Sequence, residues 1–471
     1  MLRRTKPTSH PFYFMARFIL RLYSTFLWLA QPLLRRKLRR RAMAEPGYGK
    51  AISERFGRYP QPIDSLMPHS STDALGHFVW IHAVSLGETR AAAILLTALR
   101  AQWPDMRLLL THGTATGRAE GEKLLLPGDV QVWQPWDTPS AVARFLHKFK
   151  PVVGILMETE VWPNLVAGCQ QQGVPLVLAN ARFNEKSLRK AQRLGWLARP
   201  AYGALTAVWA QTEADAERLR AIGAPVQAVL GNLKFDVVPD VEQVTQGRAW
   251  RTTSTRPVVM LASSREGEEA LWLEEFVKNG APAPTGKALS AIESVASKAA
   301  PARSAVQWLI VPRHPQRFDE VYQLLSRAGL RVSRRSQWVA APPDTDVWLG
   351  DSLGEMALYY GLADVALLGG SFAPLGGQNL IEAAACGCPV VLGPYTFNFA
   401  EAAVAACSAG AAQRVDDMAQ GLRLASEWAS DPRRLARGCT QAAQFALDHR
   451  GAAQRTAGAL ADVLAARHVR K

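Results

Sequence analysis

The stretch ADVALLGGSFAPLGGQNLIEAAACGCPVVLGP, residues 363–394, has the pattern of one βαβ unit and decides the fold class. Its short apolar run Val365–Leu368 predicts a strand that ends at two glycines. Asn379 is a favourable N-cap for the helical run Leu380–Cys386, which the following glycine and proline bring to an end. A second apolar run, Val390–Leu392, predicts the next parallel strand.

The loop between the first strand and the helix is rich in glycine, and it has two interpretations. Gly376 and Gly377 leave backbone N–H groups uncovered ahead of a helix N-terminus, where a phosphate is favoured. Glu382 would then reach the hydroxyls of a ribose. In the structural alternative, Asn379 and Glu382 form a capping-box pair and bind nothing. The glycine content exceeds what capping requires, which favours a nucleotide site.

The length and composition indicate a folded protein of two domains. A chain of 471 residues is too long for one core, and an apolar fraction of 48% excludes a disordered chain. Five cysteines, an odd number without a disulfide framework, indicate a reducing compartment. The close pair Cys386 and Cys388 has no second pair to complete a metal site, so we interpret it as packing.

The net charge of +15 belongs mainly to the first 50 residues. They hold twelve lysines and arginines and one acidic residue, Glu45, so the rest of the chain carries only +4. The aromatic residues Phe12, Tyr13, Phe14 and Trp28 lie in the apolar run of this segment and not among its charges, which argues against a nucleic-acid tail. We therefore expect no nucleic-acid partner.

The apolar stretch Phe12–Leu34 is followed by a basic cluster at residues 35–41. Arg17 and Arg21 interrupt the stretch on one helix face, and each would cost about 2.5–3.5 kcal/mol at the centre of a bilayer. A helix lying in the membrane interface therefore fits better than a spanning helix. The basic cluster would attract anionic lipid of the inner membrane, keep the body on the cytoplasmic face, and argue against a cleaved signal peptide.

Short apolar runs alternate with helical patterns from Phe78 onward, which predicts parallel α/β architecture. The expected strands are Phe78–His82, Leu108–Leu110, Val130–Trp133, Val152–Leu156, Leu176–Leu178, Thr206–Ala210, Val226–Leu230, Val258–Leu261, Trp308–Val311, Val347–Leu349, Val365–Leu368 and Val390–Leu392.

The lapse of this pattern at Val237–Arg256 predicts an interdomain linker. We therefore expect a membrane-associating segment at 1–50 and two doubly wound, Rossmann-like domains that face a cleft. The predicted domains are 51–240 and 257–440, with a surface insertion at 280–304 and a helical tail at 441–471. Ligands of such sheets bind beyond the carboxyl ends of the strands, so polar clusters at those ends are the candidates for chemistry.

The segment HAVSLGET, residues 82–89, turns from the first strand into a helix and has two interpretations. Ser85 and Glu88 have the spacing of a capping box, in which Glu88 only satisfies backbone N–H groups. Alternatively, Glu88 is a general base, because a carboxylate at the end of a strand can take a proton from an acceptor hydroxyl. The pattern alone does not separate the two.

Two further strand ends of the first domain carry polar side chains. Glu158 and Glu160 predict contacts with sugar hydroxyls or arginines, although an acidic helix start is the structural alternative. Asn180 and Arg182 follow the next strand. Together with Ser85, these four residues are the candidates for the acceptor side of the site.

The second domain has four successive strand ends with anion- or hydroxyl-binding residues. Ser263 follows one strand, and Arg313, which suits bidentate contact with phosphate, follows the next. Glu355 lies in a glycine-containing turn before a helix, and the loop 369–382 is the fourth. A lone histidine such as His314 is more often structural than catalytic. The four ends together predict a nucleotide site.

The sequence also excludes several classes of enzyme. No cluster of His, Cys and Asp has metal-ligand spacing, so we expect no metal and no cofactor. The G-x-S-x-G, P-loop and G-x-G-x-x-G patterns are missing, which argues against hydrolases, ATPases and dehydrogenases.

Taken in order, these motifs resemble those of the Kdo transferases over nearly the whole chain. The resemblance rests on His82-Ala83-x-Ser85-x-Gly87-Glu88, Met157-Glu158-Thr159-Glu160-x-Trp162-Pro163-Asn164, Asn180-Ala181-Arg182, Gly231-Asn232-Leu233-Lys234-Phe235-Asp236, Pro312-Arg313-His314-Pro315-x-Arg317, Gly350-Asp351-Ser352-Leu353-Gly354-Glu355 and Gly376-Gly377-Gln378-Asn379-x-x-Glu382.

The resemblance implies a GT-B fold and the transfer of Kdo from CMP-Kdo, with inversion, onto a lipid A precursor. It implies Glu88 as the base and attachment to the cytoplasmic face of the inner membrane through the N-terminal segment. The residues that it implies for binding CMP-Kdo are Ser263, Pro312, Arg313, His314, Gly354, Glu355, Met356, Asn379, Glu382 and Lys234.

Two alternatives remain open. One is another GT-B enzyme that uses a nucleotide sugar, such as a UDP-sugar transferase or epimerase. The other is a non-catalytic, membrane-bound protein that binds a nucleotide sugar, against which the acidic residues Glu88, Glu158 and Glu160 argue.

Overall fold

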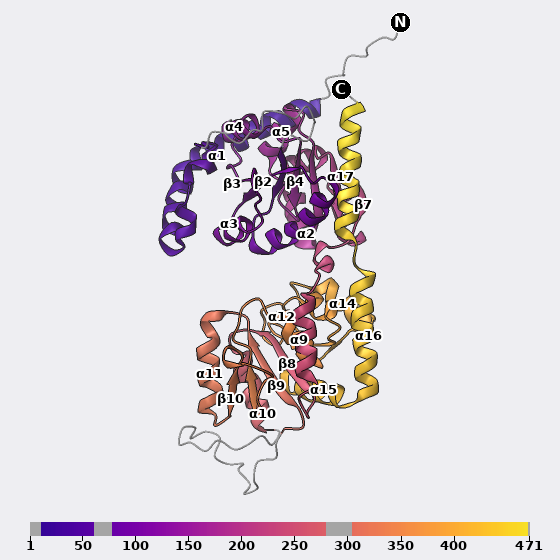
Figure 1. The fold of residues 1–471 in the computed structure, drawn as a ribbon. Helices are drawn as coiled ribbons and strands as arrows, with labels where there is room; N and C mark the ends of the chain where they lie inside the picture. The colour runs from indigo at the N-terminus through magenta and orange to yellow at the C-terminus, as the bar shows by residue number, and fades with distance from the viewer. Residues whose placement is uncertain (1–10, 61–77, 279–303, 470–471) are drawn as a thin grey trace. The chain divides into compact units, whose positions relative to one another are not determined.

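The computed structural model describes residues 11–60, 78–278 and 304–469 (Figure 1). The predicted insertion at 280–304 lies outside these residues except for Ser304. The chain divides into two compact units, one of residues 1–236 and 451–471 and one of residues 237–450. Each is described by itself.

The first unit contains a parallel sheet of seven described strands in the order β3-β2-β1-β4-β5-β6-β7. Its strands are β1 (Phe78–His82), β2 (Arg107–His112), β3 (Val130–Trp133), β4 (Val153–Met157), β5 (Leu176–Ala181), β6 (Ala207–Ala210) and β7 (Val226–Val229). Successive residues of β1 enter different cores, because Phe78 and Trp80 join one apolar cluster and Val79 and Ile81 another. Helices therefore cover both faces of the sheet, as in doubly wound proteins.

The helices of the first unit alternate with these strands and include both ends of the chain. They are α1 (Pro11–Ala44), α2 (Leu86–Gln102), α3 (Ala115–Glu122), α4 (Pro139–Phe149), α5 (Pro163–Gln171), α6 (Glu185–Arg193), α7 (Gly195–Gly203), α8 (Glu213–Ala221) and α17 (Ala452–Val469). Short 3-10 helices are η1 (Pro46–Gly49), η2 (Ile52–Phe56) and η4 (Leu233–Asp236).

Helix α1 packs on the first unit instead of standing alone. Leu38 is buried, Arg35 stacks on the ring of Phe56 at 4.2 Å, and Arg41 stacks on Tyr48 at 4.1 Å. Within the described residues, no helix combines the length and the apolar character needed to cross a membrane.

The second unit contains a parallel sheet of seven described strands in the order β10-β11-β9-β8-β12-β13-β14. The strands are β8 (Val258–Ser264), β9 (Gln307–Pro312), β10 (Val332–Arg334), β11 (Val347–Leu349), β12 (Val365–Leu368), β13 (Val390–Leu392) and β14 (Ala412–Arg414). The βαβ unit predicted from residues 363–394 is present as β12, α13 and β13, and β12 pairs with β8 and β13 in parallel.

The helices of the second unit are α9 (Val241–Arg251), α10 (Glu268–Lys278), α11 (Phe318–Arg327), α12 (Met356–Leu362), α13 (Leu380–Ala385), α14 (Ala400–Ser408), α15 (Met418–Ser430) and α16 (Pro432–Asp448), with the short 3-10 helices η5 (Pro315–Arg317) and η6 (Arg335–Gln337). The prediction that Val237–Arg256 forms a linker was wrong, because most of this segment forms helix α9, which packs against α12. The close approach requires glycine, because a β-carbon on Gly247 would collide with the backbone oxygen of Leu358.

The residues predicted as a C-terminal helical tail are divided between the two units. Helix α16 belongs to the second unit, whereas α17 packs beside α2 of the first (Figure 1). The carboxylate of Asp236 accepts hydrogen bonds from the N–H groups of Gly451 and Ala453, each at 2.5 Å. Asp236 thus ties the start of α17 to the end of the segment that precedes the second unit.

Candidate functional site

Each sheet has a topological switch point, where ligands of doubly wound proteins bind. In the first unit β1 lies between β2 and β4, and in the second β8 lies between β9 and β12. The predicted site residues follow these strands and their neighbours. Sequence and topology therefore place one candidate cluster at the carboxyl edge of each sheet.

Glu88 lies in the first turn of α2, at the switch point of the first unit. Its carboxylate accepts hydrogen bonds from Val84 N–H at 2.9 Å and from the Ser85 hydroxyl at 2.9 Å. The Ser85 hydroxyl oxygen in turn accepts a bond from Glu88 N–H at 3.4 Å. The capping box, one of the two interpretations of this motif, is therefore present in the structure.

The electrostatic environment of Glu88 is compatible with a role as a general base in addition to its role in capping. The pKa of Glu88 is raised to about 7, mainly by burial and in addition by the nearby carboxylates of Glu158 and Glu160. The bonds from Val84 and Ser85 act in the opposite direction. A carboxylate with a pKa near 7 is suited to general base catalysis at neutral pH.

Glu158 lies directly after β4 and pairs with a lysine. Lys234 Nζ is 3.2 Å from Glu158 Oε1, and both side chains are mostly buried. Glu158 adopts the left-handed conformation, with φ of 57°, which is uncommon for residues other than glycine. The structure thus places Lys234, predicted among the donor ligands, beside the acceptor candidates of the first unit.

Asn180 connects β5 to the segment that carries Lys234. It is buried at a register shift in β5, with φ of 52°, and its Oδ1 accepts a bond from Leu233 N–H at 3.1 Å. Among the described atoms, its Nδ2 has no partner. Arg182, two residues further on, is exposed. Asn180 is therefore mainly a positioning residue for Leu233 and Lys234.

Glu160 completes the acidic set of the first unit. It accepts a hydrogen bond from the indole N–H of Trp162 at 3.0 Å. Burial raises the pKa of Glu160, and the charge of Glu158 adds to this effect. Glu88, Glu158 and Glu160 thus influence one another, with Lys234 as the cation that pairs with one of them.

In the second unit, Ser263 and Met356 lie together at the end of β8. Ser263 has φ of 54°, and its hydroxyl is 3.9 Å from Met356 Sδ. Gly354, with φ of 80°, turns the chain into α12, and a β-carbon there would meet no atom within 4 Å. Glu355 accepts a hydrogen bond from Arg335 at 2.7 Å and another from Ser352.

Arg313 and Arg317 follow the same strand but differ in role. Arg317 is buried and forms a bidentate pair with Glu269, with both N–O distances at 2.9 Å. Arg313 is exposed, whereas the neighbouring Pro312 is buried. Burial lowers the pKa of His314, as does the nearby Arg265. Arg313 is therefore the arginine of this motif that is accessible to a ligand.

The glycine-rich loop that follows β12 already holds an anion, which corrects one expectation. Glu268, fully buried at the start of α10, accepts bonds from Gly370 N–H at 2.6 Å, Phe372 N–H at 3.0 Å and Ala373 N–H at 3.3 Å. These three N–H groups are therefore not available to a phosphate. Gly377 N–H, which the sequence predicted to be uncovered, donates to Gly370 O at 2.7 Å. The glutamate was visible in the sequence, but its long-range partners were not.

Asn379 and Glu382 lie at the start of α13, as predicted. Asn379 Oδ1 accepts a hydrogen bond from Ile381 N–H at 3.1 Å, so Asn379 is the N-cap. Glu382 is half-buried in the first turn.

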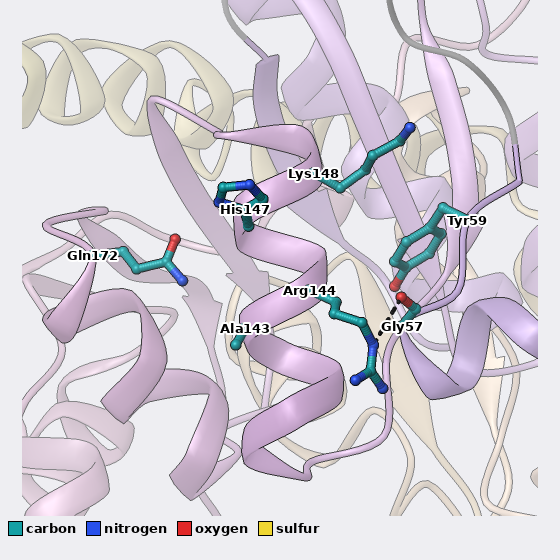
Figure 2. A pocket seen from close by; sticks show the side chains of 7 residues that line it. All are labelled: Gly57, Tyr59, Ala143, Arg144, His147, Lys148 and Gln172. Atoms are coloured by element: carbon teal, nitrogen blue, oxygen red, sulfur yellow. Dashed lines mark hydrogen bonds between the residues drawn. The ribbon is translucent and has the colours of Figure 1, made fainter.

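The described residues also contain cavities that hold none of the predicted site residues. One in the first unit, of about 540 Å³, is lined by Tyr59, Arg144, His147, Lys148, Gln172, Gly57 and Ala143 (Figure 2). It lies along the C-terminal half of α4, where Arg144 donates to Gly57 O at 3.3 Å. Among the described residues, no group of three or more His, Cys, Asp and Glu side chains could hold a metal ion.

Comparisons with known proteins agree with the motifs. The family model for 3-deoxy-D-manno-octulosonic-acid transferase (kdotransferase) matches residues 50–237. A 3-deoxy-D-manno-octulosonic acid transferase of Bordetella pertussis is 48% identical over 392 residues, which cover 82% of this chain and 87% of that protein. The enzyme of the same name from Haemophilus influenzae is 30% identical over 383 residues, covering 80% and 83%.

Solved structures support the fold. A glycosyltransferase of Rickettsia africae has a TM-score of 0.51 and 11% identity, covering 82% of this chain and 98% of that one. An Anabaena protein, HepE, in complex with UDP has a TM-score of 0.51 and 13% identity, covering 83% and 100%. With two doubly wound parallel sheets and close relatives of one activity, the chain has the GT-B fold and belongs to the 3-deoxy-D-manno-octulosonic acid transferase family of glycosyltransferases.

Proposed function

We propose that this chain transfers Kdo from CMP-Kdo to a lipid A precursor, with Glu88 as the general base. Membership of the Kdo transferase family supports the donor and the reaction class. The observation that carries the mechanism is the carboxylate of Glu88 at the switch point of the first sheet, with a pKa raised to about 7.

In the proposed step, a hydroxyl of the acceptor attacks the anomeric carbon of Kdo. A new carbon–oxygen bond forms as the bond from that carbon to the phosphate oxygen breaks, and CMP leaves with the bonding electrons. Glu88 takes the hydroxyl proton, and attack opposite the leaving group inverts the anomeric centre. No metal or other cofactor takes part in the proposed step.

The second unit is the proposed donor site. Arg313, exposed after β9, would contact the phosphate of CMP, and charge-assisted bonds of this kind are the strong ones. Ser263, Met356 and the turn at Gly354 lie together one strand away. Glu382, with Asn379, would contact the ribose. Pro312 and His314 would complete the wall of the site beside Arg313.

We also propose that α1 binds the cytoplasmic face of the inner membrane. Its residues Phe18, Leu22, Phe26, Leu29 and Leu33 recur every three or four positions, so they form one stripe, and each is more than half exposed. An exposed apolar stripe followed by the exposed cations of residues 35–41 is typical of a helix in the interface of anionic lipid.

The deciding experiment is incubation of the full chain with CMP-Kdo and a tetraacylated lipid A precursor, followed by mass spectrometry of the lipid. We expect the mass of the acceptor to rise by one or more Kdo units. The matched control, Glu88→Gln, should still bind CMP-Kdo but form product at least about 100-fold more slowly. Transfer from UDP-sugars in place of CMP-Kdo, or CMP-Kdo binding without any product from the unaltered protein, would overturn the proposal.

A further inference from the structure

Helix α1 has two sides, and only one of them carries the apolar stripe described above. The side chains of Tyr23 and Ser24 are partly buried against the first unit. Helix α1 there contacts α5 and α7. Helix α5 follows directly on the loop that carries Glu158 and Glu160.

The first turn of α5 has no cap of its own. It begins at Pro163 after Trp162, whose side chain makes no capping hydrogen bond. The first N–H groups of a helix lack partners within the helix and must find acceptors elsewhere. Asp137, in the turn before α4, supplies both of its oxygens, to Asn164 N–H at 3.0 Å and to Leu165 N–H at 2.8 Å.

Two residues of α1 lie against this cap: Tyr23 lies beside Asp137, and Ser24 lies beside Asn164. Burial is the largest cause that raises the pKa of the Tyr23 hydroxyl, and the charge of the Asp137 carboxylate raises it as well. The Ser24 hydroxyl lies 2.9 Å from Asn164 Oδ1 and 2.6 Å from Leu20 O, so these two acceptors share its proton. Asn164 itself is buried, and its Nδ2 donates to Asp137 O at 2.6 Å.

The loop from Glu158 to Trp162 is therefore held at both ends. At its start, Glu158 N–H donates to Ala179 O at 3.1 Å and Glu158 O accepts from Arg182 N–H at 3.2 Å. Its end is the first turn of α5. Glu160 lies between these two anchors and is held within the loop by Trp162. The geometry of Glu160 thus depends on contacts that α1 makes.

We propose that Tyr23 and Ser24 of α1 are positioning residues for the acceptor side of the site, acting through the first turn of α5 on Glu160. The helix that faces the membrane is then also a structural part of the acceptor site. The effect on acceptor use rests on the proposed function, whereas the effect on the loop does not.

The test uses Tyr23→Phe, Ser24→Ala and the double variant in the full chain. Thr25→Ala is the matched control, because the Thr25 hydroxyl is exposed and bonds only Arg21 O of its own helix, at 3.0 Å. Hydrogen exchange of the peptide covering residues 158–166 reports the loop without any substrate. Kinetics with CMP-Kdo and the lipid A precursor report its use, and co-sedimentation with phosphatidylglycerol vesicles reports membrane binding.

We expect each single variant to speed exchange of this peptide and to raise the KM for the acceptor by about fivefold, the factor expected for the loss of one hydrogen bond. The KM for CMP-Kdo and vesicle binding should match those of Thr25→Ala. A general loss of folding would instead change exchange throughout the unit and both KM values.

Exchange and acceptor KM equal to those of Thr25→Ala would overturn the inference, as would a loss of vesicle binding without a change in exchange. If the double variant does not fold, the two single variants decide. If the unaltered chain transfers no Kdo, the proposed function fails, and the exchange experiment decides the role of α1 alone.

Discussion

Replacing Glu88 with glutamine separates its two roles in one experiment. The amide oxygen can still accept a hydrogen bond from Val84 N–H, so the cap is largely kept, but the base is lost. General bases contribute roughly 100-fold or more to rate, so the variant should lose at least about 100-fold in kcat. In the unaltered chain, a pKa of about 7 predicts that kcat/KM falls about tenfold for each pH unit below neutrality.

The same shift predicts an effect on stability, and its sign is opposite to that of most carboxylates. The pKa of Glu88 rises from 4.5 to about 7 on folding, so the folded chain holds this proton more tightly and folding becomes less favourable as the pH rises from 4.5 to 7. Its stabilising contribution is complete below pH 4.5 and is lost as the pH rises through 7, with an upper limit of about 3 kcal/mol. Glu88→Gln should therefore unfold at a higher temperature than the unaltered chain at pH 8.

The assay is the release of CMP from CMP-Kdo in the presence of acceptor, measured between pH 5.5 and 8.5, with thermal unfolding of both proteins over the same range. A kcat of Glu88→Gln within about tenfold of that of the unaltered chain, or a rate independent of pH in the unaltered chain, would refute the role of base. A difference in melting temperature that does not change with pH would refute the raised pKa.

Four further variants test contacts described above. Lys234→Met should leave a buried carboxylate unpaired near Glu88 and move the midpoint of the pH–rate profile upward by about half a unit or more. Arg317→Ala should destabilise the chain by about 3–5 kcal/mol in chemical unfolding, because it removes the partner of the buried Glu269 carboxylate. Arg313→Ala should destabilise the chain less, because Arg313 is exposed, and should weaken CMP-Kdo binding about tenfold or more in calorimetry. Gly247→Ala should lower the melting temperature, since overpacking typically costs about 1–3 kcal/mol and its β-carbon would meet a backbone carbonyl of α12.

The sheets were predictable because most strands are buried on both faces and therefore form unbroken apolar runs. The strands that were not predicted are β10 and β14, whose three-residue sequences Val-Ser-Arg and Ala-Gln-Arg lie at the edges of their sheet and are only partly buried. Helix α9 escaped detection for a similar reason, since its only buried residue is Gly247, so it has no apolar stripe.

The parts of the candidate site formed by residues close together in the sequence were predictable. The cap formed by Ser85 and Glu88 has a fixed spacing in the sequence. The pairing of Glu158 with Lys234 joins residues 76 positions apart, and Glu268 reaches a loop more than 100 positions away. Contacts of this kind depend on the order of strands in the sheet, which local spacing does not specify.

The return of the chain to the first unit in α17 has a consequence for biosynthesis. Ala452, Ala453, Ala457 and Leu460 fill one of the two cores of that unit, yet they are translated after the whole of the second unit. During translation, this apolar surface of residues 1–236 stays uncovered until residues 451–471 have been synthesised. An isolated N-terminal half would therefore need residues 451–471 joined to it, whereas residues 237–450 emerge as one continuous piece.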